Sequence, residues 1–375
     1  MKKAILAAAV CAAMMLTACG SAYGGKELTK HIEPLEIPAA DGNLVYNNAQ
    51  MVFAVDLLRQ AAETYTEENF LISPYLAFEA WLTAANGDPD SANTDYFSGT
   101  ALSELNGFFV KWRSSQNALT EAQSLWIPQD DAAYPEKEIM QLYQGLSGTQ
   151  VFAAEKSPEM LSQWASDATE GAVKELNAPQ DDEPAMLSAA AFETVWSDLY
   201  SDNEVVNVLF TGSDGSRKAV PFLSKTYDTA TYFDDDTVTG IRKNCSGQKY
   251  MFLGLMPKSG SPAELLENMT AEQLSGYIRG GKEITLLTEI PVLDAEVTQD
   301  IAALLPDAGI GQIVQRLSVH VGRGTADSSY NLNLNASSGR PADQMIFDHP
   351  FVYFIIDRQY GLPIFAGTVG KLPLS

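Results

Sequence analysis

Apolar residues recur at helical spacing in several segments of the first half of the chain. Short apolar runs lie between them, and one of these is stopped by the Ser73-Pro74 pair, as is typical of a short buried strand. The Asn86-Gly87 pair is a helix stop signal at the end of a periodic segment. We therefore predict strands over 70–72 and 124–127 and helices over 48–65, 76–85, 102–113 and 158–176.

The second half of the chain has a different pattern, in which β-branched and aromatic residues form short runs between turn residues. The acidic segment 180–183 marks the change. Here we predict helices over 262–274 and 298–305 and strands over 185–196, 218–223, 229–233, 238–242, 250–256, 351–356 and 364–369. Because no period repeats and no low-complexity linker divides the chain, we predict a single mixed α+β domain.

The net charge excludes several classes of partner. Lysine and arginine number 24 against 48 aspartates and glutamates, which gives a formal charge of -24. No segment gathers a compensating basic stripe, and phosphate backbones require one, so nucleic acid is not an expected partner. The same charge disfavours electrostatic docking to anionic lipid. Any attachment to a membrane must therefore come from something other than charge.

The N-terminus has the features of an export signal. Lys2 and Lys3 precede an apolar run over 4–16, and the small-residue sequence Leu-Thr-Ala-Cys-Gly over 16–20 follows. The apolar run is shorter than the roughly 20 residues that a membrane-spanning helix needs. The sequence around Cys19 resembles the lipobox of bacterial lipoproteins, which implies cleavage before Cys19 and attachment of lipid to its sulfur. The alternative is an ordinary signal peptide with a chance cysteine.

These features divide the chain into three parts. We expect a lipoprotein signal peptide over 1–18, a lipid-anchored polar tether over 19–43 and a folded domain over 44–375. Loss of Lys2 and Lys3 with the signal would change the net charge from -24 to -26. We expect an exported, extracytoplasmic lipoprotein of the cell surface that reaches the membrane only through the lipid on Cys19.

The search for catalytic motifs does not indicate an enzyme. The sequence contains neither the Gly-x-Ser-x-Gly of an α/β-hydrolase nor a phosphate loop. Gly322-Arg323-Gly324 begins like a dinucleotide fingerprint, but Asp327 stands at the place of the third glycine. Ser246 and Lys249 match Ser-x-x-Lys, but strand-like residues follow them and no Lys-Thr-Gly partner exists, so we interpret this segment as a turn.

Metal and cofactor chemistry is not expected either. The chain has three histidines, His31, His320 and His349, and after loss of the signal and lipidation of Cys19 one thiol, Cys245. They show no zinc-like spacing, and no disulfide framework is possible. The aspartate runs 130–131 and 234–236 lack the oxygen spacing and glycine of a calcium loop, and we interpret them as solvated turns. We expect neither a metal nor a cofactor.

Several segments in order resemble the motifs of one family, the serpins. The C-terminal segments are the most specific, with Phe-Asp-His-Pro-Phe over 347–351 followed by Phe-Ala-Gly-Thr-Val over 365–369. Earlier matches are Asn-Phe-Leu-Ile-Ser-Pro over 69–74, Leu-Thr-Ala-Ala-Asn-Gly over 82–87, Trp164 with Thr-Glu-Gly over 169–171, Ala189 to Trp196, Val-Pro-Phe-Leu over 220–223 and Leu-Met-Pro over 255–257. The usual asparagine of the fourth motif is Ala189 here.

The resemblance implies a fold and a mechanism. It implies a single domain with three β-sheets and eight to nine helices, in which Trp196 takes the place of the tryptophan at the top of the main sheet. It also implies suicide inhibition of serine or cysteine proteases. A protease cuts an exposed reactive loop, and the loop then inserts as a new strand in the main sheet and carries the acylated protease with it.

The reactive-loop segment departs from the family pattern, because the chain between 309 and 349 is shorter than expected, and two alignments are possible. In the first, the strand over 317–321 enters the loop, Gly324, Thr325, Ala326 and Asp327 form its hinge, and the cut lies around Ser338, Gly339 and Arg340. Alternating residues from Thr325 would then become buried on insertion, which places Asp327, Ser329 and Asn331 where the family has alanines. Burial of an unpaired aspartate opposes insertion.

In the second alignment, the segment with Leu332 and Leu334 is the entering strand, and only 336–345 remains as loop. Ten residues span at most about 35 Å, which is too short for insertion with a protease attached. The leading hypothesis is an exported inhibitor of serine or cysteine endopeptidases. The alternative is a non-inhibitory serpin fold that serves as a binding module or scaffold. A hydrolase with Ser246 or another reactive serine is a third possibility.

Overall fold

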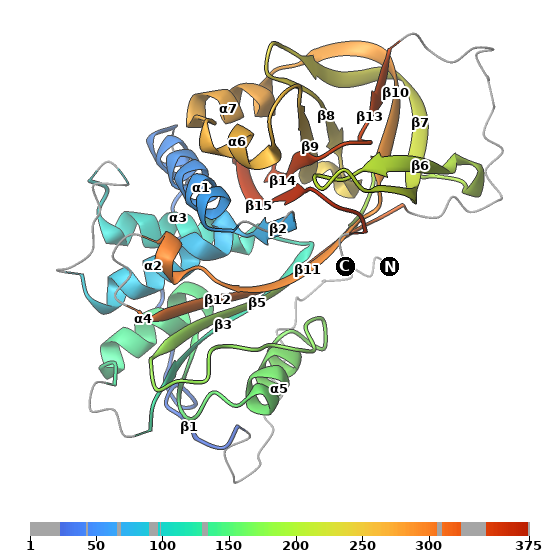
Figure 1. Cartoon of the computed structure of the whole chain (residues 1–375). Helices are drawn as coiled ribbons and strands as arrows, with labels where there is room; N and C mark the ends of the chain where they lie inside the picture. The colour runs from blue at the N-terminus through green and yellow to red at the C-terminus, as the bar shows by residue number, and fades with distance from the viewer. Residues whose placement is uncertain are drawn as a thin grey trace, which may run out of the picture.

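A six-stranded sheet forms the centre of the molecule in the computed structural model (Figure 1). The structure describes residues 23–42, 44–65, 69–89, 97, 99–129, 134–305, 310–323 and 343–373. The strand order in this sheet is β1 (Lys26–Glu27), β4 (Gln150–Ala153), β3 (Leu119–Ile127), β5 (Ala185–Val195), β12 (Gln312–Gly322) and β11 (Leu293–Asp300). The predicted mixed α+β fold is confirmed.

A second sheet has nine strands and lies above the first in Figure 1. Along its main path the order is β13 (Gln344–Ile346), β10 (Lys282–Pro291), β7 (Arg217–Asp234), β8 (Val238–Asn244), β9 (Tyr250–Pro257), β14 (Phe351–Asp357), β15 (Leu362–Val369) and β2 (Asn69–Ile72), with β6 (Val205–Thr211) on β7. The long strand β7 pairs with β6 through its first part and with β8 through its last. It thereby joins the strands outside the six-stranded sheet into one sheet, where the resemblance implies two.

Seven α-helices occur among the described residues: α1 (Leu44–Thr64), α2 (Pro74–Gly87), α3 (Leu102–Ser114), α4 (Lys137–Ser147), α5 (Pro158–Ala168), α6 (Pro262–Glu267) and α7 (Ala271–Arg279). Their starts follow from local chemistry. Ser73 accepts a hydrogen bond from the N–H of Leu76 and is followed by proline, and Ser157 does the same for α5. Helix α2 is buried over nearly its whole length, which its apolar sequence requires.

Apolar side chains cover both faces of the six-stranded sheet. The larger core lies between this sheet, the nine-stranded sheet and the helices α1, α2 and α3. A smaller core lies on the other face, where α5 packs on β3 and β5 (Figure 1). Alternate residues of β5 contribute to each core: Met186 and Ala190 to the larger, Leu187 and Ala189 to the smaller. The strands at the centre of the sheet are therefore buried on both sides.

Three predicted helices were wrong in their extent or type. The segment 298–305 is not a helix: burial alternates along β11, and the 3-10 turn Ala302–Leu304 follows. The helix predicted over 158–176 ends at Ala168, because Glu170 and Gly171 adopt positive φ values of 54° and 83°. The helix predicted over 262–274 is two helices, since Thr270 caps the start of α7.

Residues 23–42, within the expected tether, lie along the domain. Strand β1 pairs antiparallel with β4, and the N–H of Leu28 donates to the carbonyl of Val151 at 2.8 Å. The ring of Tyr23 packs on Trp126 and Phe152, with centroid distances of 6.4 and 5.4 Å. This stretch adds a strand to the edge of the six-stranded sheet. No helix among the described residues is long and apolar enough to cross a membrane.

Candidate functional site

The strands β5 and β12 lie side by side and parallel at the centre of the six-stranded sheet (Figure 1). Their pairing runs without interruption from Gln312 opposite Ala185 to Gly322 opposite Val195. The strand that enters the connection to the C-terminal strands is therefore β12, which contains 317–321 as the first alignment requires. A further strand could enter between these two only if this parallel pairing opened.

A buried side-chain contact ties β12 to the layer beneath it. The side-chain amide of Gln315 donates to the carbonyl of Ser73 at 3.0 Å, and the N–H of Ser73 donates to the side-chain oxygen of Gln315 at 3.0 Å. The hydroxyl of Ser73 donates to the carbonyl of Ile364 at 2.7 Å, so the same residue reaches the nine-stranded sheet. If β12 moves when it separates from β5, it must break these bonds or carry Ser73 along.

Three uncharged buried polar groups in or directly beside the central sheet have no hydrogen-bond partner among the described residues. They are the side-chain N–H₂ of Gln123 on β3, the hydroxyl of Ser188 on β5 and the indole N–H of Trp196. Each such group typically costs about 1–3 kcal/mol relative to a satisfied one. The described side chains and backbone of the closed sheet thus leave these polar groups unsatisfied.

Trp196 follows β5 directly and closes the end of the β5–β12 pair. Its backbone N–H donates to the carbonyl of Gly322 at 3.0 Å, and it forms an isolated β-bridge with Cys245. The side chain is fully buried, and its ring meets Phe252 edge-on at a centroid distance of 5.5 Å. Trp196 therefore lies at the end of the main sheet, where the sequence placed it. Burial raises the pKa of the neighbouring Cys245 thiol to about 12, so this thiol stays protonated.

Lys243 brings together a group that we call the strand-end cluster, consisting of Trp196, Asp198, Tyr200, Tyr227 and Lys243. The ammonium lies 2.6 Å from the carboxylate of Asp198 and 2.6 Å from the hydroxyl of Tyr227. It also lies 4.5 Å from the ring centroid of Tyr227 and 5.5 Å from that of Trp196. Burial lowers the pKa of Lys243, and the Asp198 carboxylate opposes this shift.

The loop residues predicted from the sequence lie outside the described part of the chain. These are the hinge candidates Gly324, Thr325, Ala326 and Asp327 and the scissile candidates Ser338, Gly339 and Arg340. Cys19 lies outside it as well. The described chain stops at Arg323, whose side chain forms an ion pair with Asp202 at 2.8 Å, and resumes at Asp343 before β13. Both ends of the segment are therefore fixed on the two sheets.

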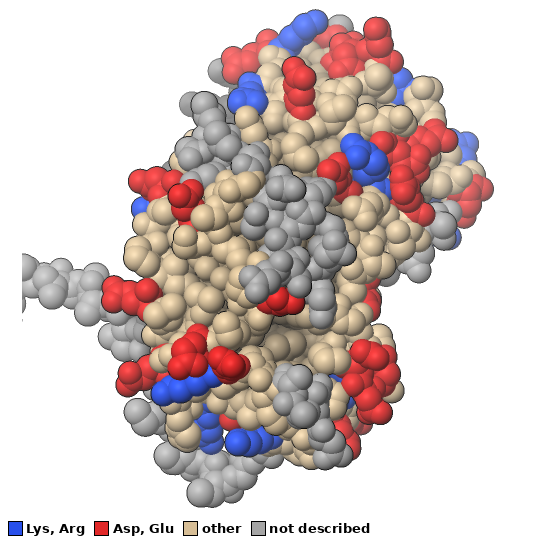
Figure 2. Space-filling model, turned by 90° about the vertical axis from the view of Figure 1, so that its left-hand side faces the viewer, with Lys and Arg blue, Asp and Glu red and all other residues tan. Residues whose placement is uncertain are grey.

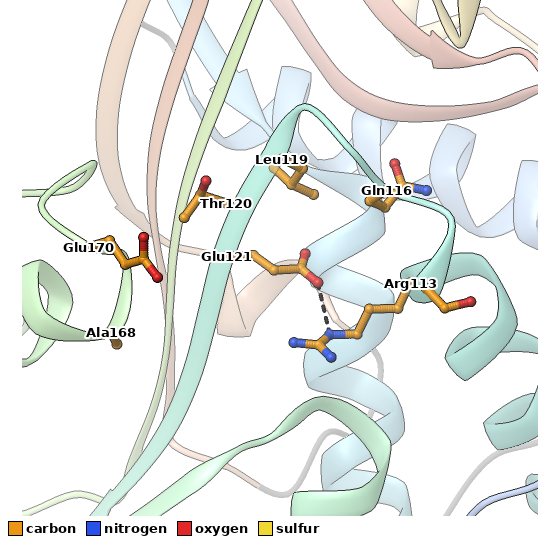
Figure 3. A pocket seen from close by; sticks show the side chains of 8 residues that line it. Arg113, Gln116, Leu119, Thr120, Glu121, Ala168 and Glu170 are labelled. Carbon is orange, nitrogen blue, oxygen red and sulfur yellow. Dashed lines mark ion pairs between the residues drawn. The ribbon is translucent and has the colours of Figure 1, made fainter. Parts of the chain in front are cut away.

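A pocket with a volume of about 460 Å³ lies beside β3, between α3 and the residues that follow α5. Figure 3 shows Glu121 pointing from β3 toward Arg113 of α3, and these two side chains form an ion pair at 2.9 Å. The hydroxyl of Tyr75 donates to the same carboxylate at 3.0 Å, and Glu79 is buried nearby on α2. Sequence reasoning missed this group, because single acidic residues in apolar segments carry no recognisable spacing.

The remaining candidate chemistry has structural explanations. Ser246 begins a 3-10 turn, and Lys249 binds the buried carboxylate of Asp357 at 2.8 Å, so the Ser-x-x-Lys segment is the predicted turn. His349 is exposed beside Asp348 at 2.7 Å. Within the described ranges, no three His, Cys, Asp or Glu side chains gather as a metal site would require. Acidic side chains are spread over the face shown in Figure 2, with fewer basic ones among them.

Comparisons with known proteins agree with this architecture. The sequence model described as "Serpin (serine protease inhibitor)" matches residues 48–321. A serpin-like protein of Thermococcus kodakarensis is 22% identical over 237 residues, which cover 56% of this chain and 55% of that protein. The "Probable non-inhibitory serpin-Z5" of Arabidopsis thaliana is 24% identical over 65% of this chain and 61% of its own length. These matches span little more than half of each relative.

A solved structure agrees over most of its length. The crystal structure of the thermophilic serpin tengpin in its native state superposes with a TM-score of 0.79 and 21% identity, and the match covers 93% of this chain and 100% of that one. This likeness concerns the fold. The sequence model covers most of the domain, from α1 to the end of β12. The chain belongs to the serpin family.

Proposed function

We propose that this serpin inhibits serine or cysteine endopeptidases through cleavage of the segment 324–342 and its insertion between β5 and β12. The protease hydroxyl or thiol would attack the carbonyl before the scissile bond and form an acyl-enzyme, and the amine of the next residue would leave. The single observation that carries the proposal is the uninterrupted parallel pair of β5 and β12, with the connection to β13 leaving from its end.

The length of the connection supports this mechanism. Strand β12 has 11 residues, so a new strand along it must span about 36 Å at ~3.3 Å per residue. If the cut falls after Ser338, the residues from Gly324 onward reach about 50 Å when extended. The cleaved segment would therefore cross the sheet completely. It would form backbone hydrogen bonds on both sides, where β5 and β12 now bond directly to each other.

Asp327 is the residue of this segment that most opposes insertion. Its side chain would turn toward the core together with Ser329 and Asn331, and an unpaired buried carboxylate costs at least several kcal/mol unless it takes up a proton. Inhibition is a race between insertion and hydrolysis of the acyl-enzyme. Slow insertion therefore favours release of a cleaved serpin over trapping. We infer that Asp327 lowers the yield of trapped protease.

Incubation with proteases of trypsin-like, chymotrypsin-like, elastase-like and papain-like specificity tests the proposal. We expect at least one of them to form a complex that survives boiling in detergent, with the cut at 338–340. Asp327→Ala should raise the ratio of complex to cleaved serpin about tenfold, since one unpaired charge is removed. A protease without its nucleophile is the control and should form no complex. Loop cleavage without complex in both the parent chain and Asp327→Ala would refute the proposal.

A second candidate function is a non-inhibitory serpin used as a binding module or scaffold. The polar residues Asp327, Ser329 and Asn331 at positions that insertion would bury favour it. The Arabidopsis relative described as probable non-inhibitory also supports it, since the family contains such members. This candidate predicts loop cleavage by many proteases and trapping of none of them.

We further propose that the chain is exported and anchored by lipid on Cys19, outside the cytoplasm. The basic start, the short apolar run and the small residues before Cys19 support this location. Metabolic labelling with a fatty-acid analogue in a bacterial host should mark the parent chain and leave Cys19→Ala unlabelled. Equal labelling of both, or of neither, would contradict it.

A further inference from the structure

A pocket of about 570 Å³ lies on the nine-stranded sheet, away from the loop segment. It forms where the C-terminal end of α7 meets β8 and the turn between β14 and β15. Arg242 comes from β8, Arg279 from the last residue of α7 and Arg358 from the turn, and all three line the pocket. Three arginines around one small pocket are unexpected in a chain with twice as many acidic as basic residues.

None of these three arginines forms an ion pair within 4.0 Å with a carboxylate of a described residue. Glu283 also lines the pocket but does not approach that closely. Burial lowers the pKa of Arg242, the positive charge of Arg358 lowers it further, and Glu283 offsets only part of this. The pocket thus holds positive charges, two of which repel each other and which the described side chains compensate only in part.

The acidic residue beside Arg358 does not compensate them, because it is already occupied. The carboxylate of Asp357 is fully buried and accepts hydrogen bonds from Trp112 at 3.1 Å, from Gln116 at 2.9 Å and from Lys249 at 2.8 Å. Its other oxygen accepts a hydrogen bond from the backbone N–H of Gln359 at 2.9 Å, and its charge is balanced by Lys249.

Most guanidinium donors of the three arginines are free to bind a ligand. Each guanidinium has five N–H donors. Arg242 donates to the carbonyl of Ile278, Arg279 to that of Ser275 at 3.3 Å, and Arg358 to the backbone and side-chain oxygens of Gln248 at 2.8 and 3.4 Å. The carbonyl groups at the end of α7 explain why two positive charges lie there. These carbonyl groups do not explain the position of Arg358, which comes from the β14–β15 turn.

We propose that this pocket binds a small organic or inorganic molecule with clustered anionic oxygens, of the polyphosphate or polycarboxylate class, through Arg242, Arg279 and Arg358. Guanidinium groups bind carboxylate and phosphate oxygens through paired N–H donors. Asn244 and Gln359 line the same pocket and offer neutral donors, while Met251 offers an apolar wall. The volume is that of a small-molecule site and too small for a folded partner. A ligand there would clamp α7 to β8 and to the β14–β15 turn.

Isothermal titration of the full chain with inorganic pyrophosphate and with citrate, at low ionic strength, tests this site. We expect at least one of the two to bind with a stoichiometry of one and to raise the unfolding midpoint. The tighter of the two identifies phosphate or carboxylate as the preferred oxygen donor. No heat and no shift in midpoint with either ligand in the millimolar range would overturn the proposal.

Three variants distinguish a built site from general charge attraction. Arg358→Gln should weaken binding about tenfold, because it removes a charged donor pair. Lys174→Gln removes one exposed positive charge elsewhere and should change the affinity less than about twofold. Glu283→Gln removes the only carboxylate among the described residues that line the pocket and should tighten binding severalfold. The Glu283 variant keeps the test valid if Arg358→Gln fails to fold. Equal loss in the Arg358 and Lys174 variants, or no tightening in the Glu283 variant, would overturn the proposal.

Discussion

At the scale of single residues, the most unusual group is the buried pair of glutamates beneath the central sheet. Glu79 and Glu121 face one guanidinium, Arg113, which forms its ion pair with Glu121. Burial raises the pKa of Glu79 well above its ordinary value of 4.5, the charge of Glu121 raises it further, and Arg113 opposes both. One side-chain oxygen of each glutamate has no partner among the described residues, so the ion pair with Arg113 is what distinguishes Glu121 from Glu79. Glu79 is therefore the group of this pair that we expect to hold a proton at neutral pH.

A proton on Glu79 at neutral pH predicts that the stability of the fold depends on pH. The folded state keeps a proton on Glu79 above pH 4.5, where the unfolded chain has lost it, so stability falls as the pH rises beyond that value. Glu79→Gln cannot lose a proton and should be more stable than the parent at pH 8, by about 1–3 kcal/mol. The gain should shrink toward pH 5. Denaturant unfolding of both chains across this range measures it.

The matched control is Glu121→Gln, which breaks the ion pair with Arg113 and should destabilise the fold at neutral pH. If both variants changed stability in the same direction, or if the gain from Glu79→Gln did not depend on pH, the assignment of the proton to Glu79 would be wrong.

At the scale of elements, the β5–β12 pair is the part that the proposed insertion must open. Glu193 of β5 lies opposite His320 of β12 near the end of the pair, and both are exposed on the same face of the sheet. Adjacent strands are about 4.8 Å apart, within the range that a disulfide bridges. A Glu193→Cys/His320→Cys chain, once oxidised, should be cleaved in its loop but should trap no protease. Addition of a reductant should restore the complex, measured on denaturing gels.

Each single cysteine variant serves as the control and should trap protease with or without reductant. Full trapping by the oxidised double variant would show that the loop inserts elsewhere or that trapping needs no insertion.

Periodicity predicted many of the elements, and its errors have physical causes. The helices over 48–65 and 102–113 and the C-terminal strands were confirmed, because their apolar faces are continuous. The helix predicted over 298–305 was wrong because the apolar residues of this segment all follow β11, in and around the 3-10 turn Ala302–Leu304, and this short run imitates helical spacing. The strands 218–223 and 229–233 were predicted separately but form the single strand β7, which bends from one partner to the next.

At the scale of the whole molecule, ordered short motifs predicted the family, and composition alone could not. The strand-end cluster around Lys243 and the arginine pocket each join residues far apart in the chain, and each residue alone looks like an ordinary surface or core position. The arginine pocket becomes visible only when the topology brings β8, α7 and the β14–β15 turn together. The place of Trp196 could be anticipated because a motif fixes it at the end of β5.

The central claim is that the severed segment becomes a strand between β5 and β12, and the thermal unfolding midpoint before and after a single cut at 338–340 tests it most directly. A new central strand adds two rows of backbone hydrogen bonds and buried surface. We therefore predict that the midpoint of the nicked chain rises by about 10 °C or more. An unchanged or lower midpoint after complete cleavage would contradict the account.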